Sequence, residues 1–214
     1  MEKPNFWTRR RFAQALAAGA LLAPLAARAA PGRDALLKDD VLPDLWIGNP
    51  DAKIAIIEYA SVSCPHCAAF HMGTYKVLKE KYIDTGKVRF VLREFPSDPL
   101  AMAGFMLARC ENDALKRADM LNLLFTEQRI WLEPANGDAV NTLSELVRRQ
   151  GMSHQQFESC LRRQDVYEKI IHMRTHAVDV FGVDSTPTFF INAEKLVGNH
   201  PIEAFDRVIE GLAK

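Results

Sequence analysis

Residues 54–67 of this chain read IAIIEYASVSCPHC, an apolar run that leads into two cysteines separated by two residues. The run predicts a buried strand, and Pro65 suits the first turn of a following helix, where its missing N–H would have no partner anyway. The start of a helix offers unpaired N–H groups and a partial positive charge to the sulfur of Cys64. Two cysteines in this position indicate thiol–disulfide chemistry.

The two cysteines are expected to play different parts. Only Cys64 faces the helix end and the solvent, so we expect it to be the attacking thiolate and Cys67 to be the resolving thiol. Pro65 stiffens the turn, and His66, when protonated, places positive charge beside the Cys64 sulfur. Because these features favour the thiolate, they stabilise the reduced protein and predict that the pair oxidises other thiols.

A Cys-X-X-Cys pair can also be half of a zinc site, which needs two further ligands at suitable spacing. Cys110 and Cys160 are single cysteines in helical segments, and His71 lies too near on the same helix to complete a tetrahedron and is expected on the helix surface. His172 and His176 share a helical face, but no third ligand is evident there. We therefore expect neither a metal nor an organic cofactor.

The first 29 residues have the pattern of an export signal. Three arginines in residues 9–11 are followed by an uncharged, Ala-rich stretch, and Ala27-Arg28-Ala29 has the form of a cleavage site. This order predicts a signal peptide at residues 1–29, cleaved near Ala29 and too short in its apolar part to span a membrane. The arginines followed by Phe12 favour the twin-arginine route, and a general secretory signal with an ordinary basic start is the alternative.

Export would place the chain in an oxidising compartment, which we expect to be the periplasm. The whole sequence has 27 basic and 27 acidic residues; residues 1–29 hold five of the basic and one of the acidic residues, which leaves 22 and 26 and a net charge of about −4. Such a chain has no basic face to suggest nucleic acid as a partner. The remaining residues suffice for one domain with a substantial core.

The order of apolar patterns predicts an α/β fold with an inserted all-helical domain. Strands are expected at residues 53–61, 88–95 and 188–191, whereas helical spacing prevails without a strand signal between the second and third of them. The predicted segments are a loose leader (30–43), a first α/β part (44–95), a helical insertion (96–181, with helices near 101–124, 139–149, 155–163 and 166–181) and a second α/β part (182–214).

A second functional signal is a proline far from the cysteines. In the stretch Ser185-Thr186-Pro187-Thr188-Phe189, Pro187 opens a strand after a helix and a turn. A cis proline there would place its neighbour's backbone beside the active cysteines, as an edge for an extended substrate. The alternative is a proline that merely ends the preceding helix.

The segment from Glu58 to Cys67, the helical insertion and Thr186-Pro187 together resemble the DsbA branch of the thioredoxin superfamily. The resemblance extends over nearly all of the chain from Asp44 onward. It implies a thioredoxin fold, with Pro187 as the cis-proline and Thr186 before it. The best-known members carry valine in place of Thr186, so a hydroxyl here would alter the grip on substrates and the redox poise.

The resemblance also implies roles for the residues around the cysteines. Cys64 would be the nucleophile, Cys67 the resolving cysteine and His66 the main modulator of redox poise. Glu58 matches an acidic strand residue of the family and could relay protons to the buried Cys67. The alternative is that Glu58 is an ordinary edge carboxylate.

The two other cysteines, Cys110 and Cys160, are both expected to face inward from helices. In an exported protein they predict a structural disulfide, which would close a loop of about fifty residues and stabilise the fold by about 4 kcal/mol through lost chain entropy. It is the one pairing compatible with a Cys64–Cys67 redox bond. Two separate buried thiols are the alternative.

These patterns predict a monomeric, periplasmic thiol:disulfide oxidoreductase that donates a disulfide to reduced or unfolded exported polypeptides. The resemblance implies that a DsbB-like, quinone-linked membrane oxidase would reoxidise it. The nearest alternative is a disulfide isomerase or reductase of the same fold, although isomerases usually carry a separate dimerisation domain and only residues 30–43 are available for one. The alternative from another class is a non-catalytic peptide- or zinc-binding module, which predicts that alanine at Cys64 leaves function intact.

Overall fold

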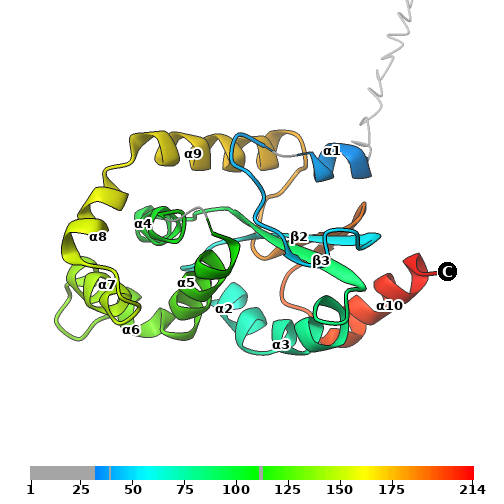
Figure 1. The fold of residues 1–214 in the computed structure, drawn as a ribbon, viewed down its shortest axis with the longest axis horizontal. Coiled ribbons are helices and arrows are strands. Elements are labelled where there is room, and N and C mark those ends of the chain that lie inside the picture. Colours follow the sequence, from blue (N-terminus) through cyan, green and yellow to red (C-terminus); the bar gives the residue numbers. More distant parts are fainter. Residues whose placement is uncertain (1–31, 39, 111–112) are drawn as a thin grey trace, which may run out of the picture.

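The computed structural model describes residues 32–214 apart from 39, 111 and 112, so the predicted signal peptide lies outside the described residues. At the centre of the described part is a five-stranded sheet of order β1-β3-β2-β4-β5 (Figure 1). β2 pairs in parallel with β3 and antiparallel with β4, and β1 and β5 add to the two edges in antiparallel fashion. The strands are β1 (Ile47–Gly48), β2 (Ile54–Ala60), β3 (Val88–Glu94), β4 (Thr188–Ile191) and β5 (Glu194–Val197).

The central strand β2 is buried at every position. A continuous apolar run is what a strand needs when both faces of its sheet are covered, so the sequence pattern and the burial agree. Ile56 and Ala60 pack into the larger core with Phe70, whereas Ile57 and Tyr59 pack into a second cluster on the opposite face. The sheet is thus the middle of three layers.

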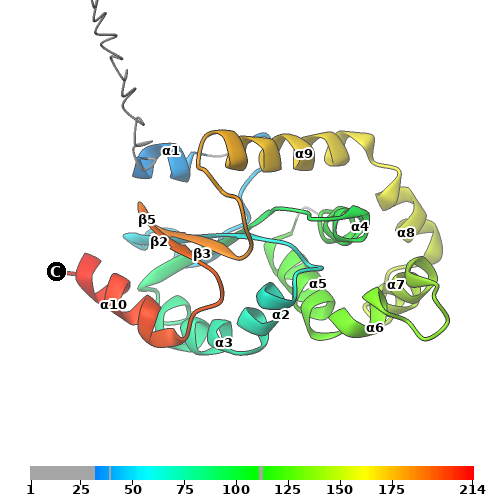
Figure 2. The same ribbon diagram turned by 180° about the vertical axis from the view of Figure 1, so that it is seen from behind.

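Helices cover both faces of this sheet, as Figures 1 and 2 show. One face carries α1 (Arg33–Leu37) and α9 (Gln164–Asp179), and the other carries α2 (Pro65–Met72), α3 (Thr74–Leu78) and α10 (Ile202–Leu212). The single helix expected after Cys64 is divided at Gly73, whose backbone leaves the helical region, and a π-helical turn at Lys79–Ile83 follows α3. The division leaves α2 as a short helix whose first turn holds both cysteines.

The chain between β3 and β4 is helical, and apart from α9 its helices gather at one end of the sheet (Figure 1). The helix expected near residues 101–124 is two helices, α4 and α5, and the short α6 was not expected. Side chains of Asp98, Asp113, Asp138 and Ser153 each accept a hydrogen bond from a first-turn N–H, which explains where four of these helices begin. Besides α9, this part comprises α4 (Pro99–Ala108), α5 (Ala114–Thr126), α6 (Gln128–Leu132), α7 (Ala139–Arg148) and α8 (His154–Leu161).

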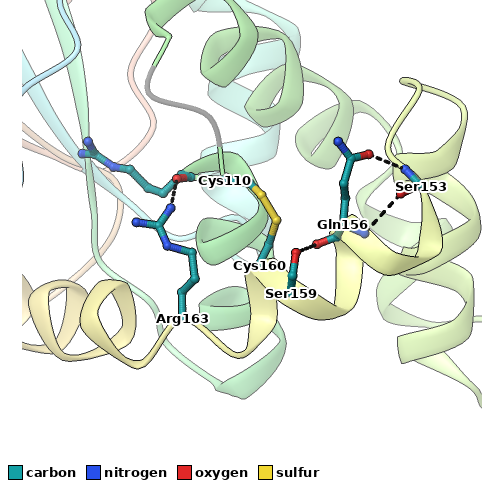
Figure 3. The surroundings of a disulfide bond; sticks show 7 residues. Cys110, Ser153, Gln156, Ser159, Cys160 and Arg163 are labelled. Carbon is teal, nitrogen blue, oxygen red and sulfur yellow. Dashed lines mark hydrogen bonds between the residues drawn. A yellow bond between two sulfur atoms is a disulfide. The ribbon is translucent and has the colours of Figure 1, made fainter.

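A disulfide joins Cys110, just after α4, to Cys160 in α8 (Figure 3). The two Cα atoms are 5.4 Å apart, within the usual range for such a bond. Cys160 is buried, whereas Cys110 is only partly buried, so the expectation that both face fully inward is met by one of them. Beside the bond, Arg163 donates a hydrogen bond of 3.2 Å to the carbonyl of Arg109, which ties the start of α9 to the same point.

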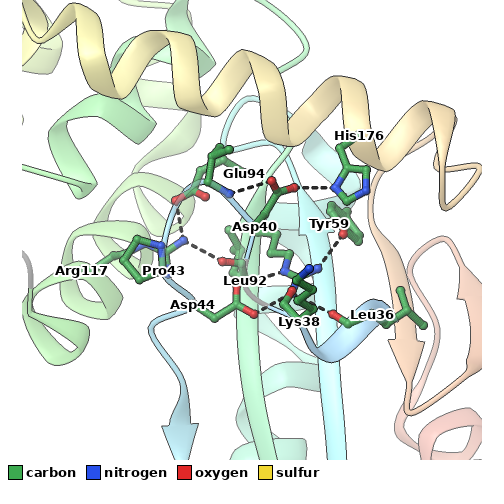
Figure 4. A network of polar contacts seen from close by, with 12 residues as sticks. Leu36, Lys38, Asp40, Pro43, Asp44, Tyr59, Leu92, Glu94, Arg117 and His176 are labelled. Carbon is green, nitrogen blue, oxygen red and sulfur yellow. Dashed lines mark hydrogen bonds and ion pairs between the residues drawn. The ribbon is translucent and has the colours of Figure 1, made fainter. Parts of the chain in front are cut away.

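The leader, expected to be loose, is instead held against the sheet, and Figure 4 shows Leu36, Lys38 and Asp40 within the network of polar contacts that holds it. The guanidinium of Arg93, in β3, donates hydrogen bonds to the carbonyl of Leu36 at 2.8 Å and to the carboxylate of Asp44 at 2.7 Å. Its remaining donors reach Tyr59 and the Lys38 carbonyl. A buried guanidinium needs acceptors for its donors, and the leader supplies two of them, the carbonyls of Leu36 and Lys38.

Two further contacts extend this attachment. Arg109 donates a hydrogen bond of 2.8 Å to the carbonyl of Pro43, and the imidazole of His176 in α9 lies 2.7 Å from the carboxylate of Asp40. The prediction of a loose leader was wrong because the composition of residues 30–43 does not show that Arg93 and Arg109 donate hydrogen bonds to their backbone carbonyls. Within the described residues, no helix combines the length and the apolar character needed to cross a membrane.

Candidate active site

The two cysteines of the Cys-X-X-Cys pair lie where β2 leads into α2. Cys64 is the N-cap residue of α2, and Pro65 occupies its first turn. Cys64 is partly exposed, whereas Cys67, one turn further along, is completely buried. Both are thiols in the structure, which therefore represents the reduced pair.

The surroundings of Cys64 favour its thiolate. The pKa of Cys64 is lowered to about 5, and the largest cause is a hydrogen bond from the Cys67 thiol. The Thr186 side chain and the N–H groups of Cys67 and His66 also lower it, whereas partial burial acts in the opposite direction. Such donors stabilise a negative sulfur, as expected at the start of a helix. Cys64 is therefore ionised at neutral pH.

The surroundings of Cys67 have the opposite effect. Burial, the hydrogen bond to Cys64 and the negative charge of Glu58 all raise the pKa of the Cys67 thiol. One sulfur of the pair is thus a nucleophile at neutral pH, and the other keeps its proton until a base removes it. This is the asymmetry that an attacking and a resolving cysteine require.

The proline loop lies directly against Cys64. The Thr186–Pro187 peptide bond is cis, and the Thr186 carbonyl lies 3.4 Å from the Cys64 sulfur. Because β4 begins at Thr188 and pairs with β2, the sheet brings these two segments together although they are 122 residues apart in the chain. Pro187 is buried, and its own carbonyl accepts a hydrogen bond from Gly198.

The two residues between the cysteines, Pro65 and His66, are exposed. The backbone N–H of His66 contributes to the low pKa of Cys64. The exposed side chain of His66 is open to an approaching substrate.

Glu58 is completely buried in β2, on the side of the sheet that faces α2. One of its carboxylate oxygens lies 2.8 Å from Nε2 of His71. His71 was expected on the helix surface, and that expectation was wrong, because only 8% of the residue is exposed. The sequence did hold a signal: His71 follows Cys67 by four residues, so the two share one face of α2.

Sequence reasoning also missed a side chain that supports the cysteine loop. The Gln128 amide, on the unexpected helix α6, donates hydrogen bonds to the carbonyls of Val62 at 2.8 Å and Cys64 at 3.0 Å. The hydroxyls of Ser61, Ser63 and Ser97 form a further network on the other side of this loop. The described residues contain no cluster of three or more His, Cys, Asp or Glu side chains that could hold a metal ion.

Comparison with known proteins finds similarity over most of the chain. Residues 40–211 match a family model described as thioredoxin. A Rickettsia felis protein named as a candidate protein-disulfide oxidoreductase is 28% identical over 167 residues, covering 78% of this chain and 59% of its own length. A Rickettsia bellii protein with the same name is 30% identical over 170 residues, with 78% and 65% covered. This chain therefore spans about three fifths of the length of these curated relatives.

A solved structure gives a more complete match. The crystal structure of alpha-DsbA1 from Wolbachia pipientis superposes with a TM-score of 0.76 at 29% identity, and the match covers 85% of this chain and 96% of that one. The similarity therefore includes the sheet, the covering helices and the helices between β3 and β4.

Proposed function

Since the chain belongs to the thioredoxin family, we propose that it is a DsbA-type thiol:disulfide oxidoreductase that donates a Cys64–Cys67 disulfide to reduced exported proteins. The observation that carries this proposal is the contrast between the two thiols: Cys64 is partly exposed with a pKa of about 5, and Cys67 is buried with a raised pKa. The names of the Rickettsia relatives and the likeness to alpha-DsbA1 support it.

In the proposed reaction, a substrate thiolate attacks Cys64 in the oxidised pair. A mixed disulfide forms, and Cys67 leaves as a thiolate that takes up a proton. A second substrate thiolate then attacks the substrate sulfur of the mixed disulfide, so the substrate becomes the disulfide and Cys64 leaves as a thiolate. The low pKa of Cys64 makes it a good leaving group and favours the reduced enzyme, with roughly 30 mV of oxidising potential per pKa unit.

The cis-proline loop is the proposed guide for the substrate. The Thr186 backbone lies beside Cys64, and an extended polypeptide could pair with it while presenting its own cysteine to the sulfur. The Thr186 side chain contributes to the low pKa of Cys64, so its hydroxyl would tune the redox poise as well as the substrate contact. His66 would add positive charge at the mouth of the site when protonated.

The remaining proposals are based on the sequence patterns and on the resemblance to the DsbA branch. We propose that a twin-arginine signal at residues 1–29 directs export to the periplasm. The exported protein is proposed to be a monomer, with a helical domain (96–181) inserted into a thioredoxin-like domain (44–95 and 182–214). A DsbB-like, quinone-linked membrane oxidase is proposed to reoxidise it. The basic, apolar and small-residue order of residues 9–29 supports export. Glu58 is proposed to relay protons to Cys67, supported by its complete burial and by its effect on the pKa of Cys67.

The first experiment is a redox titration of the purified protein in graded glutathione buffers, with the Cys64 and Cys67 thiols counted by alkylation and mass. We expect a reversible two-electron transition at or above about −180 mV, in the range of protein disulfide isomerase. A Cys64→Ala variant should lose the transition and all disulfide transfer to a reduced, unfolded substrate, with Cys110–Cys160 still bonded.

The other outcomes distinguish the alternatives. A potential near −270 mV, as in thioredoxin, would favour a reductase or isomerase of the same fold. Absence of any transition, or full function in the Cys64→Ala variant, would contradict the redox role and favour a peptide- or zinc-binding module.

A further inference from the structure

A buried histidine, His71, lies on α2 four residues after the resolving cysteine and contacts Glu58, whose charge acts on that cysteine. Nε2 of His71 is 2.8 Å from Oε2 of Glu58, and the two residues are 8% and 0% exposed. A buried acid–base pair in a strand and a helix is costly to desolvate, so its position beside a reactive thiol calls for a chemical explanation.

The imidazole is held in one orientation by aromatic rings. It stacks on Phe125 of α5, with ring centres 4.1 Å apart and planes within 10° of parallel. Tyr75 packs at 4.8 Å, and Phe70 meets it edge-on at 5.3 Å. With its ring fixed, His71 also fixes the carboxylate of Glu58.

The other carboxylate oxygen of Glu58 has no hydrogen-bond partner among the described residues, although it is buried. The negative charge of Glu58 acts on Cys67, since it is one of the causes that raise the pKa of that thiol. A buried carboxylate that has an oxygen without a partner, and whose charge reaches a thiol that must gain and lose a proton, is suited to receive that proton.

His71 also lines a small cavity. It measures about 30 Å³ and is lined by His71 together with Leu45, Arg117 and Asn122, among others. Most of the lining is apolar, and its polar residues are His71, Tyr75, Arg117 and Asn122. The volume has room for one water molecule, and these four side chains are the groups that would bind it. His71 thus lies between the carboxylate and a place where a proton can be exchanged with water.

We propose that His71 is a positioning residue that holds Glu58 toward Cys67 and passes protons between Glu58 and water during disulfide exchange. The inference rests on the proposed function, because it assigns a role in the same thiol chemistry. It extends that function from the two sulfurs to a relay of Cys67, Glu58, His71 and water.

Protons and electrons balance in both directions of this relay. When the enzyme disulfide is reduced, the Cys67 thiolate released by substrate attack takes a proton from Glu58, which is replenished through His71. When the enzyme is reoxidised, the Cys64 thiolate first attacks a disulfide of the oxidising partner, which forms a mixed disulfide with one partner sulfur and releases the other as a thiolate. Glu58 then accepts the Cys67 proton, which His71 passes to water. The Cys67 thiolate attacks the Cys64 sulfur, closes the Cys64–Cys67 disulfide and releases the second partner thiolate. The electron pair moves between sulfur atoms only.

Other titratable groups face this site from the neighbouring elements. Tyr75 of α3 contacts the imidazole ring, and burial and the charge of Glu58 raise its pKa, so it stays protonated. Arg117 of α5 lines the cavity but is bonded to Glu94. Cys64 has a pKa of about 5, so it remains a thiolate across the neutral range.

The test measures how fast Cys67 attacks a mixed disulfide between Cys64 and glutathione. Reduced protein is mixed with oxidised glutathione, quenched in acid at millisecond times and analysed by mass, from pH 6 to pH 9. In the His71→Gln variant we expect this step to be roughly 10- to 100-fold slower than in the wild type at pH 6. The difference should shrink as pH rises, because hydroxide then removes the Cys67 proton directly.

The chain offers a matched control in His154 of α8. It faces Glu158 at 3.9 Å in an exposed pair, so His154→Gln removes a histidine beside a glutamate without touching the site. That variant should reproduce the wild-type pH profile. Because His71 acts through Glu58, the double variant Glu58→Gln/His71→Gln should be no slower than Glu58→Gln alone.

Two results would overturn the proposal. A His71→Gln profile that equals the wild type, or one that is lowered by the same factor at every pH, would leave His71 with a structural role only. If His71→Gln does not fold, His71→Phe, which retains the ring stack on Phe125, takes its place with the same expected profile. If the wild type itself does not react with oxidised glutathione, both the proposed function and the relay are contradicted. If the wild type reacts and the His71 variant is unaffected, only the relay is contradicted.

Discussion

Glu58 and Glu94 are both completely buried carboxylates on neighbouring central strands, yet their surroundings differ. Glu94 accepts two hydrogen bonds from Arg109, at 2.7 and 3.0 Å, and a third of 2.6 Å from Arg117. Glu58 has one hydrogen-bonding side-chain neighbour, His71, and an oxygen without a partner among the described residues. The first charge is fully bonded, as a structural ion cluster must be, whereas the second retains capacity for a proton.

The comparison shows how two identical side chains in one sheet acquire different roles. Arg109, directly after α4, and Arg117 of α5 keep Glu94 ionised, and their hydrogen bonds to it fix these helices to β3. An imidazole nitrogen can either donate or accept a proton, whereas a guanidinium only donates, so the Glu58–His71 pair is the one suited to proton transfer. If this distinction is correct, the two glutamates should respond differently to the same substitution.

The largest effect is expected for Glu94→Gln. Loss of this carboxylate leaves two buried guanidinium groups without their counterion, and the free energy of unfolding should fall by about 3–5 kcal/mol. Urea unfolding followed by circular dichroism measures the change, and Glu210→Gln, at an exposed position of α10, should stay within about 0.5 kcal/mol of the wild type. A loss below about 1 kcal/mol for Glu94→Gln would remove the contrast with Glu58.

A somewhat smaller effect is expected from acid. Burial by itself would raise the pKa of Glu94, but Arg109 and Arg117 lower it to about 2, from an ordinary value of 4.5. A depressed folded-state pKa contributes stability above the unfolded pKa, and that stability is lost as pH falls from about 4.5 to 2. The loss should approach about 3 kcal/mol.

The same unfolding measurement, repeated between pH 5 and pH 2, checks this expectation. The difference in unfolding free energy between the wild type and Glu94→Gln should narrow steadily through the interval. A constant difference would mean that Glu94 does not keep its charge through the salt bridges described above.

The smallest stability effect is expected for Glu58→Gln. The amide keeps an acceptor for His71 and removes a buried charge that has an unbonded oxygen, so the free energy of unfolding should change by no more than about 1 kcal/mol, or rise. Urea unfolding at neutral pH measures it alongside Glu94→Gln. A loss comparable to that of Glu94→Gln would make Glu58 a structural residue and weaken its assignment as a relay.

The sequence predicted the parts of the site that local patterns encode. The strand at 54–60 and the cysteine pair follow from an apolar run and from spacing, and Pro187 was identifiable because a proline opens the next core strand. That these segments meet depends on pairing between β2 and β4, which the resemblance to the DsbA branch implied and the observed register provides.

The parts that sequence did not predict depend on contacts between distant elements. Glu94, Arg109 and Arg117 lie on three elements, and nothing in their spacing marks them as one cluster. His71 was wrongly expected at the surface because helical periodicity shows which residues share a face of a helix but not what packs against that face. Phe125 of α5 covers the face that was expected to be exposed. The leader was misjudged for the same reason, since its acceptors are backbone carbonyls that composition does not show.

The long separation between the two halves of the site also bears on the order in which a growing chain acquires reactivity. Synthesis delivers Cys64 and Cys67 well before Thr186, which follows 122 residues after Cys64 and touches it only once β4 docks on β2. Contacts of such separation form late, because a long loop must close first. A nascent chain therefore carries both thiols before it has the backbone edge that directs them toward a partner.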